Sequence, residues 1–267
     1  MTSPLTPIFR AVAATVAFIG ELGLLLMDAA AAVGPGLLRR RGRRVGWINL
    51  WAQMVRVGVR AVPIVCLVLF CIGAILALQM APPLREFGKV AAVADVIAVS
   101  IFREIGPLVS AIVLTGFAGA SIAAELGTMV VSEEIEAMES LAIPPTRFLV
   151  LPRVLATTVM MICLAVVGDL LGSIGGLVVS ATILGIDPEL YVSRTFDMLK
   201  LKDFLTGLVK AGVFGCIISL LACHLGLRVS GGAQGVGVAT TRTVVLTIVA
   251  LIFVDLLFTA AFYFVNL

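Results

Sequence analysis

The chain has 267 residues, of which 61% are hydrophobic and only 13% are charged. Soluble domains typically carry about 45–50% apolar and about 25% charged residues, so a core of this size cannot bury the excess. The composition therefore predicts a polytopic membrane protein and excludes a soluble globule. The net charge of +3 at pH 7 does not indicate a nucleic-acid-binding protein, because the basic residues gather in one short block instead of alternating with aromatics.

No metal site or catalytic site is predicted. The five cysteines all fall inside apolar stretches without ligand spacing, so we interpret them as small hydrophobic residues of helices. No phosphate-binding or hydrolase motif is visible either. The glycine-rich residues 230–237 lack the lysine of a phosphate-binding loop, and they are predicted to form a flexible cytoplasmic turn. We therefore expect this chain to hold no cofactor of its own.

Residues 1–60 are predicted to form an interfacial helix and a basic connector. At 100° per residue Arg10, Glu21 and Asp28 share one side of a helix, and apolar side chains cover the remaining arc. This pattern is typical of an amphipathic helix that lies in the membrane interface. A sixth span remains the alternative, because about 20 residues nearly suffice to cross a bilayer. A signal peptide is disfavoured, because the basic block at residues 39–44 follows the apolar part.

Residues 61–267 are predicted to form an all-α membrane domain. Five segments are apolar and long enough to cross a bilayer, namely residues 61–84, 96–127, 154–182, 204–227 and 240–265. Two rows of small residues at four-residue spacing predict close helix packing, namely Gly119/Ala123/Gly127 and Gly168/Gly172/Gly176. With five spans, the two ends of the chain lie on opposite sides of the membrane.

The distribution of Lys and Arg predicts a cytoplasmic N-terminus and a C-terminus on the outer side. In this orientation the cytoplasmic segments hold twelve arginines, namely Arg10, Arg39, Arg40, Arg41, Arg43, Arg44, Arg56, Arg60, Arg147, Arg153, Arg228 and Arg242. The outer loops then hold six basic residues, namely Arg85, Lys89, Arg194, Lys200, Lys202 and Lys210. The reverse orientation would place the larger set outside, against the usual bias.

A short cytoplasmic helix is predicted over residues 132–142, between the second and third spans. Ser132 can cap a helix whose first turn is acidic, and Pro144 and Pro145 stop it. Ile135 and Met138 begin an apolar row at helical spacing, so one face is apolar and the other acidic. The pattern fits either a solvated linker helix or a docking element for a soluble partner.

Among the charged residues of the predicted spans we single out four, and each needs a partner or water because a charge in hydrocarbon costs at least about 2.5–3.5 kcal/mol. They are Arg103, Glu104, Asp169 and Asp255. Adjacent residues on a helix point about 100° apart, so Arg103 and Glu104 cannot both hide behind one neighbour. Pro107 can kink the helix there. We call Arg103 and Glu104 the charged step and interpret it as part of the wall of a water-accessible cavity. The alternative is that both charges are satisfied by partners at a helix interface.

Several strings together resemble the MlaE-type permeases, the membrane subunits of ABC lipid transporters that work with MCE-domain proteins. They are FREIGPL at 102–108, GFAGA at 116–120, AAELGTM at 123–129, the acidic stretch at 133–145, LPR at 151–153, and GAQGVG and ATTRTVV at 232–245. The match covers roughly residues 64–263. Phe117 stands where the family often has arginine, so any contact made by that arginine is absent here.

The resemblance implies a homodimeric, ABCG-like permease in a bacterial inner membrane. Each protomer would have five spans, an interfacial helix and a coupling helix seated in a separate ATPase subunit, which would hold the ATP. An MCE-domain protein and a small STAS-domain regulator are the other implied partners. Phospholipid would bind between the protomers, in a cavity lined by Arg103 and Glu104, with Gln79, Ala81 and Leu84 near its outer mouth. The coupling residues would be Glu133, Glu134, Ile135, Glu136, Met138 and Glu139.

Two readings from other classes compete with this one. A secondary transporter would use Glu104, Asp169 or Asp255 as proton or ion relays and would need no ATPase. A membrane scaffold without transport would have no cavity. The five spans show no repeat that would give inverted halves, so the ABC lipid permease is the preferred hypothesis.

Overall fold

The computed structural model describes residues 17, 20–28 and 43–265, and these residues form helices joined by short connections. In chain order the elements are α2 (Arg43–Val57), η1 (Val59–Ala61), α3 (Val62–Glu86), η2 (Val90–Ala92), α4 (Val93–Ser100), η3 (Ile101–Ile105), α5 (Gly106–Leu114), η4 (Thr115–Gly119), α6 (Ala120–Val131), α7 (Glu134–Ser140), η5 (Thr146–Val150), α8 (Leu151–Thr182), α9 (Pro188–Met198), α10 (Leu201–Gly226) and α11 (Gly232–Val265). The described residues contain no strand.

Five helical stretches in this part of the chain are long and apolar enough to cross a membrane. They are Asn49–Glu86, Val90–Val131, Thr146–Thr182, Leu201–Gly226 and Gly232–Val265. The expectation of an all-α polytopic membrane protein with five spans is confirmed. Every helical stretch begins before the apolar segment predicted for it, whereas the C-terminal ends lie within a few residues of the predicted ones.

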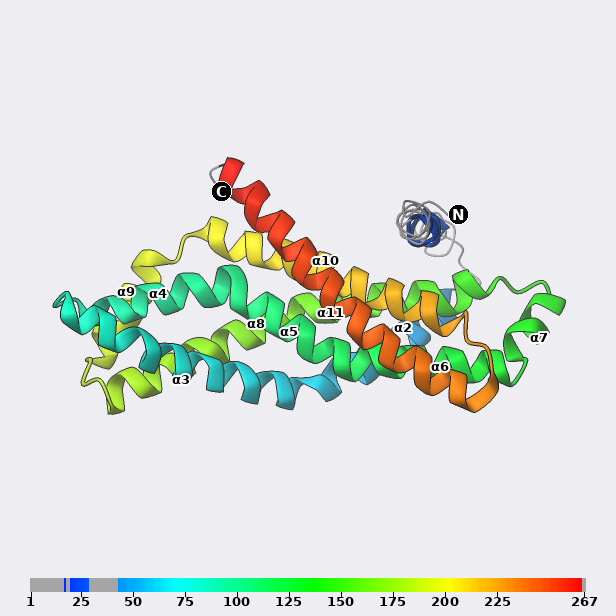
Figure 1. The fold of residues 1–267 in the computed structure, drawn as a ribbon, viewed down its shortest axis with the longest axis horizontal. Helices are drawn as coiled ribbons and strands as arrows, with labels where there is room; N and C mark the ends of the chain where they lie inside the picture. The colour runs from blue at the N-terminus through cyan, green and yellow to red at the C-terminus, as the bar shows by residue number, and fades with distance from the viewer. Residues whose placement is uncertain (1–16, 18–19, 29–42, 266–267) are drawn as a thin grey trace, which may run out of the picture.

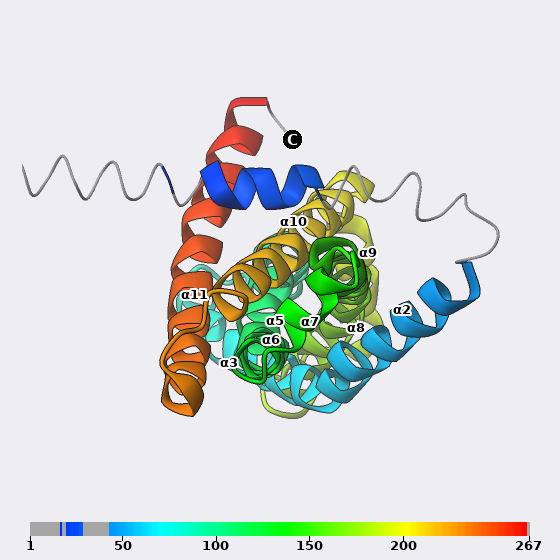
Figure 2. The same ribbon diagram turned by 90° about the vertical axis from the view of Figure 1, so that its right-hand side faces the viewer.

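The spans run along the long axis of the molecule, except that α11 crosses the others obliquely, and α7 lies at one end and α9 at the other (Figure 1). The view along that axis shows α10 near the middle of the bundle (Figure 2). It packs against α5, α6, α8 and α11. From Leu220 to Gly226 every residue of α10 is buried. A polar residue on this helix therefore has to find its partners inside the protein.

Glycines bring α3 and α8 into close contact, as the row of small residues predicts. A Cβ added at Gly73 would lie 1.8 Å from the carbonyl oxygen of Gly172, and one at Gly175 would lie 2.0 Å from that of Phe70. Such distances leave no room for any side chain. The two backbones approach closely, which is how helices gain packing energy in lipid.

The second span is not one continuous α-helix. Two π-helical turns, η3 and η4, interrupt it between α4 and α6. Each π-turn inserts one extra residue per turn and shifts the helix face that follows. The kink predicted at Pro107 is accommodated in the first turn of α5, directly after η3.

Two local predictions are wrong. Ser132 is the residue after α6, where its hydroxyl donates to the Thr128 carbonyl at 3.0 Å, and the residue before α7 is Glu133. Ser132 satisfies the preceding helix instead of capping the following one. The glycine-rich stretch is also not a flexible turn, because α11 already begins at Gly232. The turn itself is short, and Gly231 and Gly232 provide its positive φ angles of 86° and 67°.

Helix α9 closes the end of the bundle opposite α7. Its Tyr191 is buried against Gly176 of α8, and the phenol donates to the Ser173 carbonyl at 3.5 Å. Burial raises the pKa of Tyr191 to about 12, so the phenol stays neutral. Arg194 of the same helix pairs with Asp95 of α4 at 3.0 Å. These contacts hold α9 across the ends of α4 and α8.

The described helical residues 20–28 lie across the bundle. Figure 1 shows this helix end-on beside spans that run along the page, and Figure 2 shows it lengthwise, so it is nearly perpendicular to the spans. Glu21 holds it to the end of α10 through Arg228, at 2.7 Å. A helix in the membrane interface has this orientation, and the interfacial helix of residues 1–60 stays a prediction. Arg10 of the expected amphipathic pattern lies outside the described residues.

A membrane-embedded charged site

The charged step in the second span lies on a π-turn. Arg103 and Glu104 belong to η3, between α4 and α5. Turns of this kind widen the helix and recur at functional sites. Both side chains reach toward α10, but they reach different partners on it. This arrangement agrees with the expectation that Arg103 and Glu104 cannot share one partner residue.

Lys210 of α10 is the centre of the site. Its Nζ forms one ion pair with Glu104 Oε2 and a second with Asp255 Oδ1 at 2.9 Å. Nζ also donates to the hydroxyl of Thr259 at 3.0 Å, and that hydroxyl donates to Glu104 Oε1 at 2.6 Å. The cluster joins η3, α10 and α11. We call Glu104, Lys210, Asp255 and Thr259 the Lys210 cluster.

The Lys210 cluster is covered on one side and open on the other. The side chain of Lys210 is 1% exposed and that of Asp255 is 11% exposed, whereas that of Glu104 is 33% exposed. A charge is tolerated in a low-dielectric interior only when it is paired and hydrogen-bonded. Two carboxylates face one ammonium group, so the ionised cluster carries a net charge of −1. Its open side is the carboxylate of Glu104.

Arg103 finds its counter-charge two turns earlier on α10. Its Nη1 lies 3.3 Å from Asp203 Oδ1, and the arginine side chain is 31% exposed while the aspartate is 7% exposed. Asp203 also accepts a hydrogen bond from the backbone N–H of Lys200, which caps the start of α10. Asp203 and Lys210 are seven residues apart and so lie on one face of the helix. One face of α10 therefore supplies both counter-charges to the step in the second span.

The three other residues predicted to line the cavity lie on α3. Ala81 is buried and Leu84 is half-buried, and both belong to an apolar cluster that also contains Phe102. Phe102 directly precedes Arg103. The aromatic ring of Phe102 therefore links Ala81 and Leu84 to the charged step. Gln79 is exposed on α3. In the single chain Ala81 and Leu84 thus share an apolar cluster with the residue before Arg103, and Gln79 is not a member of that cluster.

Asp169 of α8 is separate from the Lys210 cluster. It is 1% exposed, and its Oδ1 has no hydrogen-bond partner among the described residues. Its carboxyl group occupies the space beside Gly106, where an added Cβ would lie 1.6 Å from Oδ1. The glycine that follows the charged step is therefore required by the carboxyl group that packs against it.

Helix α7, the predicted coupling helix, projects at one end of the molecule (Figure 1). Its apolar residues Ile135 and Met138 are half-buried and pack against the main apolar core. The acidic side chains of the segment are exposed, namely Glu133, Glu134, Glu136 and Glu139. The apolar face thus points largely toward the protein's own bundle, and the surface that α7 offers outward is acidic.

An ion-pair triad ties together the helices that carry α7. Glu125 of α6 lies 2.8 Å from Arg56 of α2 and 3.1 Å from Arg153 of α8. Arg153 is buried and also donates to the Leu149 carbonyl at 2.8 Å. Helices α6 and α8 enter and leave the α7 segment, so the triad fixes the base from which α7 projects.

Sequence reasoning missed Lys210, Asp203 and Thr259. The count of basic residues by side places Lys210 in an outer loop, and this prediction is wrong because Lys210 lies inside α10 and is fully buried. The signal was present, since Lys210 falls six residues inside the apolar segment predicted as the fourth span. A lysine within a span indicates an intramembrane partner. Nothing in the sequence pattern indicates that the hydroxyl of Thr259 is one of the hydrogen-bond partners of Lys210.

The chain matches the family model described as Permease MlaE over residues 50–261. A probable ABC transporter permease protein of Rickettsia felis is 39% identical over 211 residues, which is 79% of this chain and 82% of the relative. A probable ABC transporter permease of Synechocystis is 34% identical over 208 residues, or 78% and 79% of the two chains.

A plant protein is also similar. Protein TRIGALACTOSYLDIACYLGLYCEROL 1, chloroplastic, of Arabidopsis thaliana is 29% identical over 230 residues, covering 86% of this chain and 66% of the relative. The family match covers nearly all of the five spans and contains the charged step and the Lys210 cluster. The chain belongs to the MlaE permease family, and it is an integral membrane ABC transporter permease.

Proposed function

We propose that this permease moves phospholipids between membranes, as a homodimer driven by a separate ATPase subunit and served by an MCE-domain partner. The observation that carries the proposal is the charged step on η3, held by α10 inside the membrane bundle of an ABC permease. Arg103 is the one cation of the step, and its guanidinium is one-third exposed. A guanidinium beside apolar helices suits a phospholipid, which joins an anionic phosphate to apolar chains.

We assign Arg103 to the phosphate and Glu104 to keeping the cavity polar and wet for the headgroup. Ala81 and Leu84 would line the apolar part of the cavity, and Gln79 would lie at its outer mouth. The name of the Arabidopsis relative contains that of a galactolipid, which supports a lipid as the substrate class.

The exposed face of α11 supports a homodimer. Its buried residues are only Thr243, Thr247, Leu251 and Asp255, which form a single stripe with a spacing of four. Much of the remaining surface in the second half of α11 is apolar and exposed, including Val249, Phe253 and Leu256. A second protomer on this face would enclose a cavity whose wall includes the open side of the Lys210 cluster.

Helix α7 supports the ATPase assignment. It projects beyond the bundle and, together with Glu133 directly before it, offers four exposed glutamates to a soluble partner. The chain itself needs no cofactor in this scheme, because ATP is bound and hydrolysed on the partner subunit. We place α7 and the N-terminus in the cytoplasm of a bacterium, and the C-terminus on the periplasmic side of its inner membrane.

We place the MCE-domain partner at the opposite end, beside α9. Phe196 and Leu201 are 74% and 73% exposed there, which provides apolar contacts at the outer mouth. The small STAS-domain regulator is carried over from the resemblance, as a partner on the ATPase side.

A secondary transporter is the other candidate, and the two carboxylates of the Lys210 cluster favour it as ion relays. Membership of an ABC permease family argues against it. The two functions differ in their energy source, because the ABC permease requires ATP hydrolysis and the secondary transporter requires an ion gradient.

The test is phospholipid transfer by proteoliposomes that contain the permease, its ATPase and its MCE-domain partner. Glu104→Leu removes one of two carboxylates that share Lys210, so we expect normal insertion and dimerisation but at least about a tenfold loss of transfer. Glu86→Leu, at an exposed acid at the end of α3, is the matched control and should transfer normally. Normal ATP-driven transfer and normal lipid occupancy in Glu104→Leu would contradict the site, and transfer driven by an ion gradient without ATP would contradict the ABC mechanism.

A further inference from the structure

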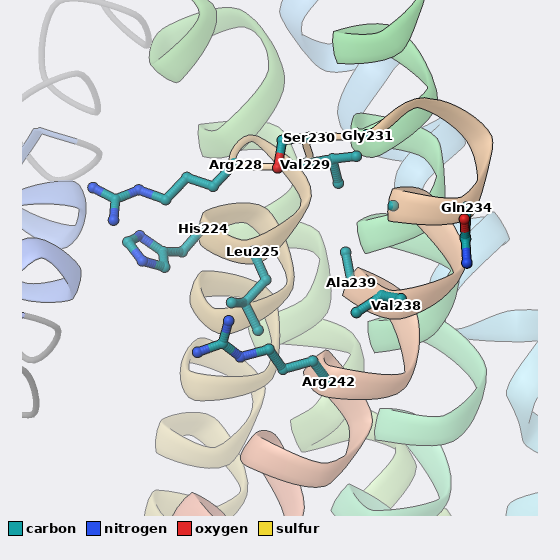
Figure 3. Close-up of a pocket in the computed structure, with 11 residues that line it drawn as sticks. His224, Leu225, Arg228, Val229, Ser230, Gly231, Gln234, Val238, Ala239 and Arg242 are labelled. Carbon is teal, nitrogen blue, oxygen red and sulfur yellow. The ribbon is translucent and has the colours of Figure 1, made fainter. Parts of the chain in front are cut away.

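A pocket opens between the end of α10 and the start of α11 (Figure 3). Both of these helix ends lie at the end of the molecule that carries α7 (Figure 1). Its volume is ≈ 410 Å³. The side chains that matter here are His224 and Arg228 at the end of α10 and Arg242 on α11. All three basic side chains point to the same side in Figure 3, toward the helix formed by residues 20–28.

The pocket has more positive than negative charge. Arg228 pairs with Glu21 at 2.7 Å, and the same carboxylate lies 3.6 Å from His224 Nε2. Arg242 has no ion-pair partner within the part of the chain that the structure describes. Two guanidinium groups thus line the pocket and only that of Arg228 is paired with a carboxylate, which leaves a binding position for a further anion.

A second hollow continues from this pocket along α11. It has a volume of ≈ 590 Å³ and shares Gln234, Val238 and Arg242 with the first. Beyond Arg242 it runs over Val245 and Leu246, so its walls become apolar. Val238 and Val245 are 62% and 55% exposed. A cationic pocket thus opens directly into an apolar groove.

The depth of the pocket separates it from the Lys210 cluster. Both spans meet the pocket at their ends, because α10 stops at Gly226 and α11 starts at Gly232. The ends of spans lie at the level of the lipid headgroups. His224 is fourteen residues beyond Lys210, which is about 21 Å along the axis of α10. One headgroup cannot reach both sites.

We propose that the pocket and groove form a second phospholipid site, in the membrane leaflet on the α7 side. Arg228 and Arg242 bind the phosphate of an anionic glycerophospholipid, and an acyl chain follows Val238, Val245 and Leu246. The inference rests on the proposed function for its ligand class. It adds a second position on the transport path, which a lipid occupies before it reaches the charged step or after it leaves it. The apolar groove distinguishes a lipid from free phosphate, since free phosphate would leave the groove empty.

Glu21 is expected to compete with the lipid phosphate for Arg228. This gives substitutions of opposite sign. Arg228→Gln with Arg242→Gln removes both phosphate ligands and should weaken lipid binding at least about tenfold, whereas Glu21→Gln frees Arg228 and should strengthen it several-fold. Arg60→Gln, at an exposed arginine on η1 outside the pocket, is the matched control and should leave binding unchanged.

The experiment uses the purified full-length permease in nanodiscs with a phosphatidylglycerol that carries a photoreactive acyl chain. Crosslinks mapped by mass spectrometry should fall on α11 between Val238 and Leu246, decrease in the double arginine variant, and increase in Glu21→Gln. Crosslinks there should persist in Glu104→Leu, so that failure of the transport proposal is distinguished from failure of this one. Two results would overturn the lipid site: absence of crosslinks on this segment, or equal crosslinking in the double arginine variant. Loss of the crosslinks when millimolar inorganic phosphate is added would also overturn it, because the pocket would then bind phosphate alone.

Discussion

Within the Lys210 cluster, the effect of a substitution on stability depends on whether Lys210 keeps a carboxylate partner and whether the carboxylates keep Lys210. Lys210 is fully buried and balances two carboxylates, Glu104 and Asp255. Loss of either acid leaves a one-to-one ion pair. Loss of the lysine leaves two carboxylates without a cation, and uncompensated buried charge is strongly destabilising. The three members of the cluster are therefore unequal, although all three are charged residues within spans.

Lys210→Met should lower the free energy of unfolding by about 3–5 kcal/mol, because it strands two acids in the bundle. Thermal unfolding of the detergent-solubilised protein measures the change. Asp255→Asn should be much milder, and Lys89→Met, at an exposed loop lysine, should have little effect.

A rescue variant separates charge from packing. Lys210→Met combined with Glu104→Gln and Asp255→Asn carries no charge in the cluster, so much of the lost stability should return. If the triple variant is as unstable as Lys210→Met alone, the methylene stem of the lysine is what matters, and the charge argument fails.

At the scale of the helices, the contact between α3 and α8 depends on the absence of side chains. The Cβ positions of Gly73 and Gly175 are occupied by backbone carbonyl oxygens of the facing helix. A carbonyl oxygen cannot rotate away as a flexible side chain can, so even a methyl group forces the helices apart.

Gly73→Ala should therefore destabilise the protein by about 1–3 kcal/mol, the usual range for overpacking, although alanine favours a helix more than glycine does. Gly116→Ala is the matched control, because an added Cβ meets nothing within 4 Å there. Thermal unfolding should show a lower midpoint for Gly73→Ala only. Equal midpoints would mean that the two helices separate without cost.

The spans could be predicted from the sequence because apolar length alone specifies them. The partners of the intramembrane charges could not be predicted, since Arg103 meets Asp203 and Glu104 meets Lys210 across about a hundred residues of chain. The π-turns at η3 and η4 also leave no compositional signal, because a single extra residue in a helix changes no residue type. The prediction for Lys210 is wrong because the rule that compares Lys and Arg on the two sides of the membrane counts each of these residues as part of a loop, even when it lies within a span.

For the whole molecule, the two ends of the bundle differ in the surfaces that they present. One end carries α7 with its exposed glutamates, the helix of residues 20–28 and the basic pocket, and the other carries α9. The triad of Glu125 with Arg56 and Arg153 connects the α7 end to three helices. A partner that moves α7 would therefore move α2, α6 and α8 together, which is a mechanical route from a docked subunit into the membrane bundle.

This arrangement changes how docking on α7 should be tested. Substitution of Ile135 and Met138 by aspartate would remove an apolar face that the bundle itself uses, so loss of a partner could reflect local unfolding. The exposed glutamates offer a cleaner change. Replacing Glu134, Glu136 and Glu139 together by lysine reverses the charge that α7 presents and leaves the half-buried face intact.

We expect this triple lysine variant to insert and dimerise normally but to lose its ATPase subunit on co-purification, because the docking surface would then carry the wrong charge. Glu86→Lys with Glu189→Lys is the control, since both are exposed acids at the opposite end of the bundle. Co-purification in rising salt provides a second readout, because an electrostatic contact weakens as the ionic strength increases. Full ATPase recovery in the triple variant would exclude the acidic face of α7 from docking and leave it as a linker between α6 and α8.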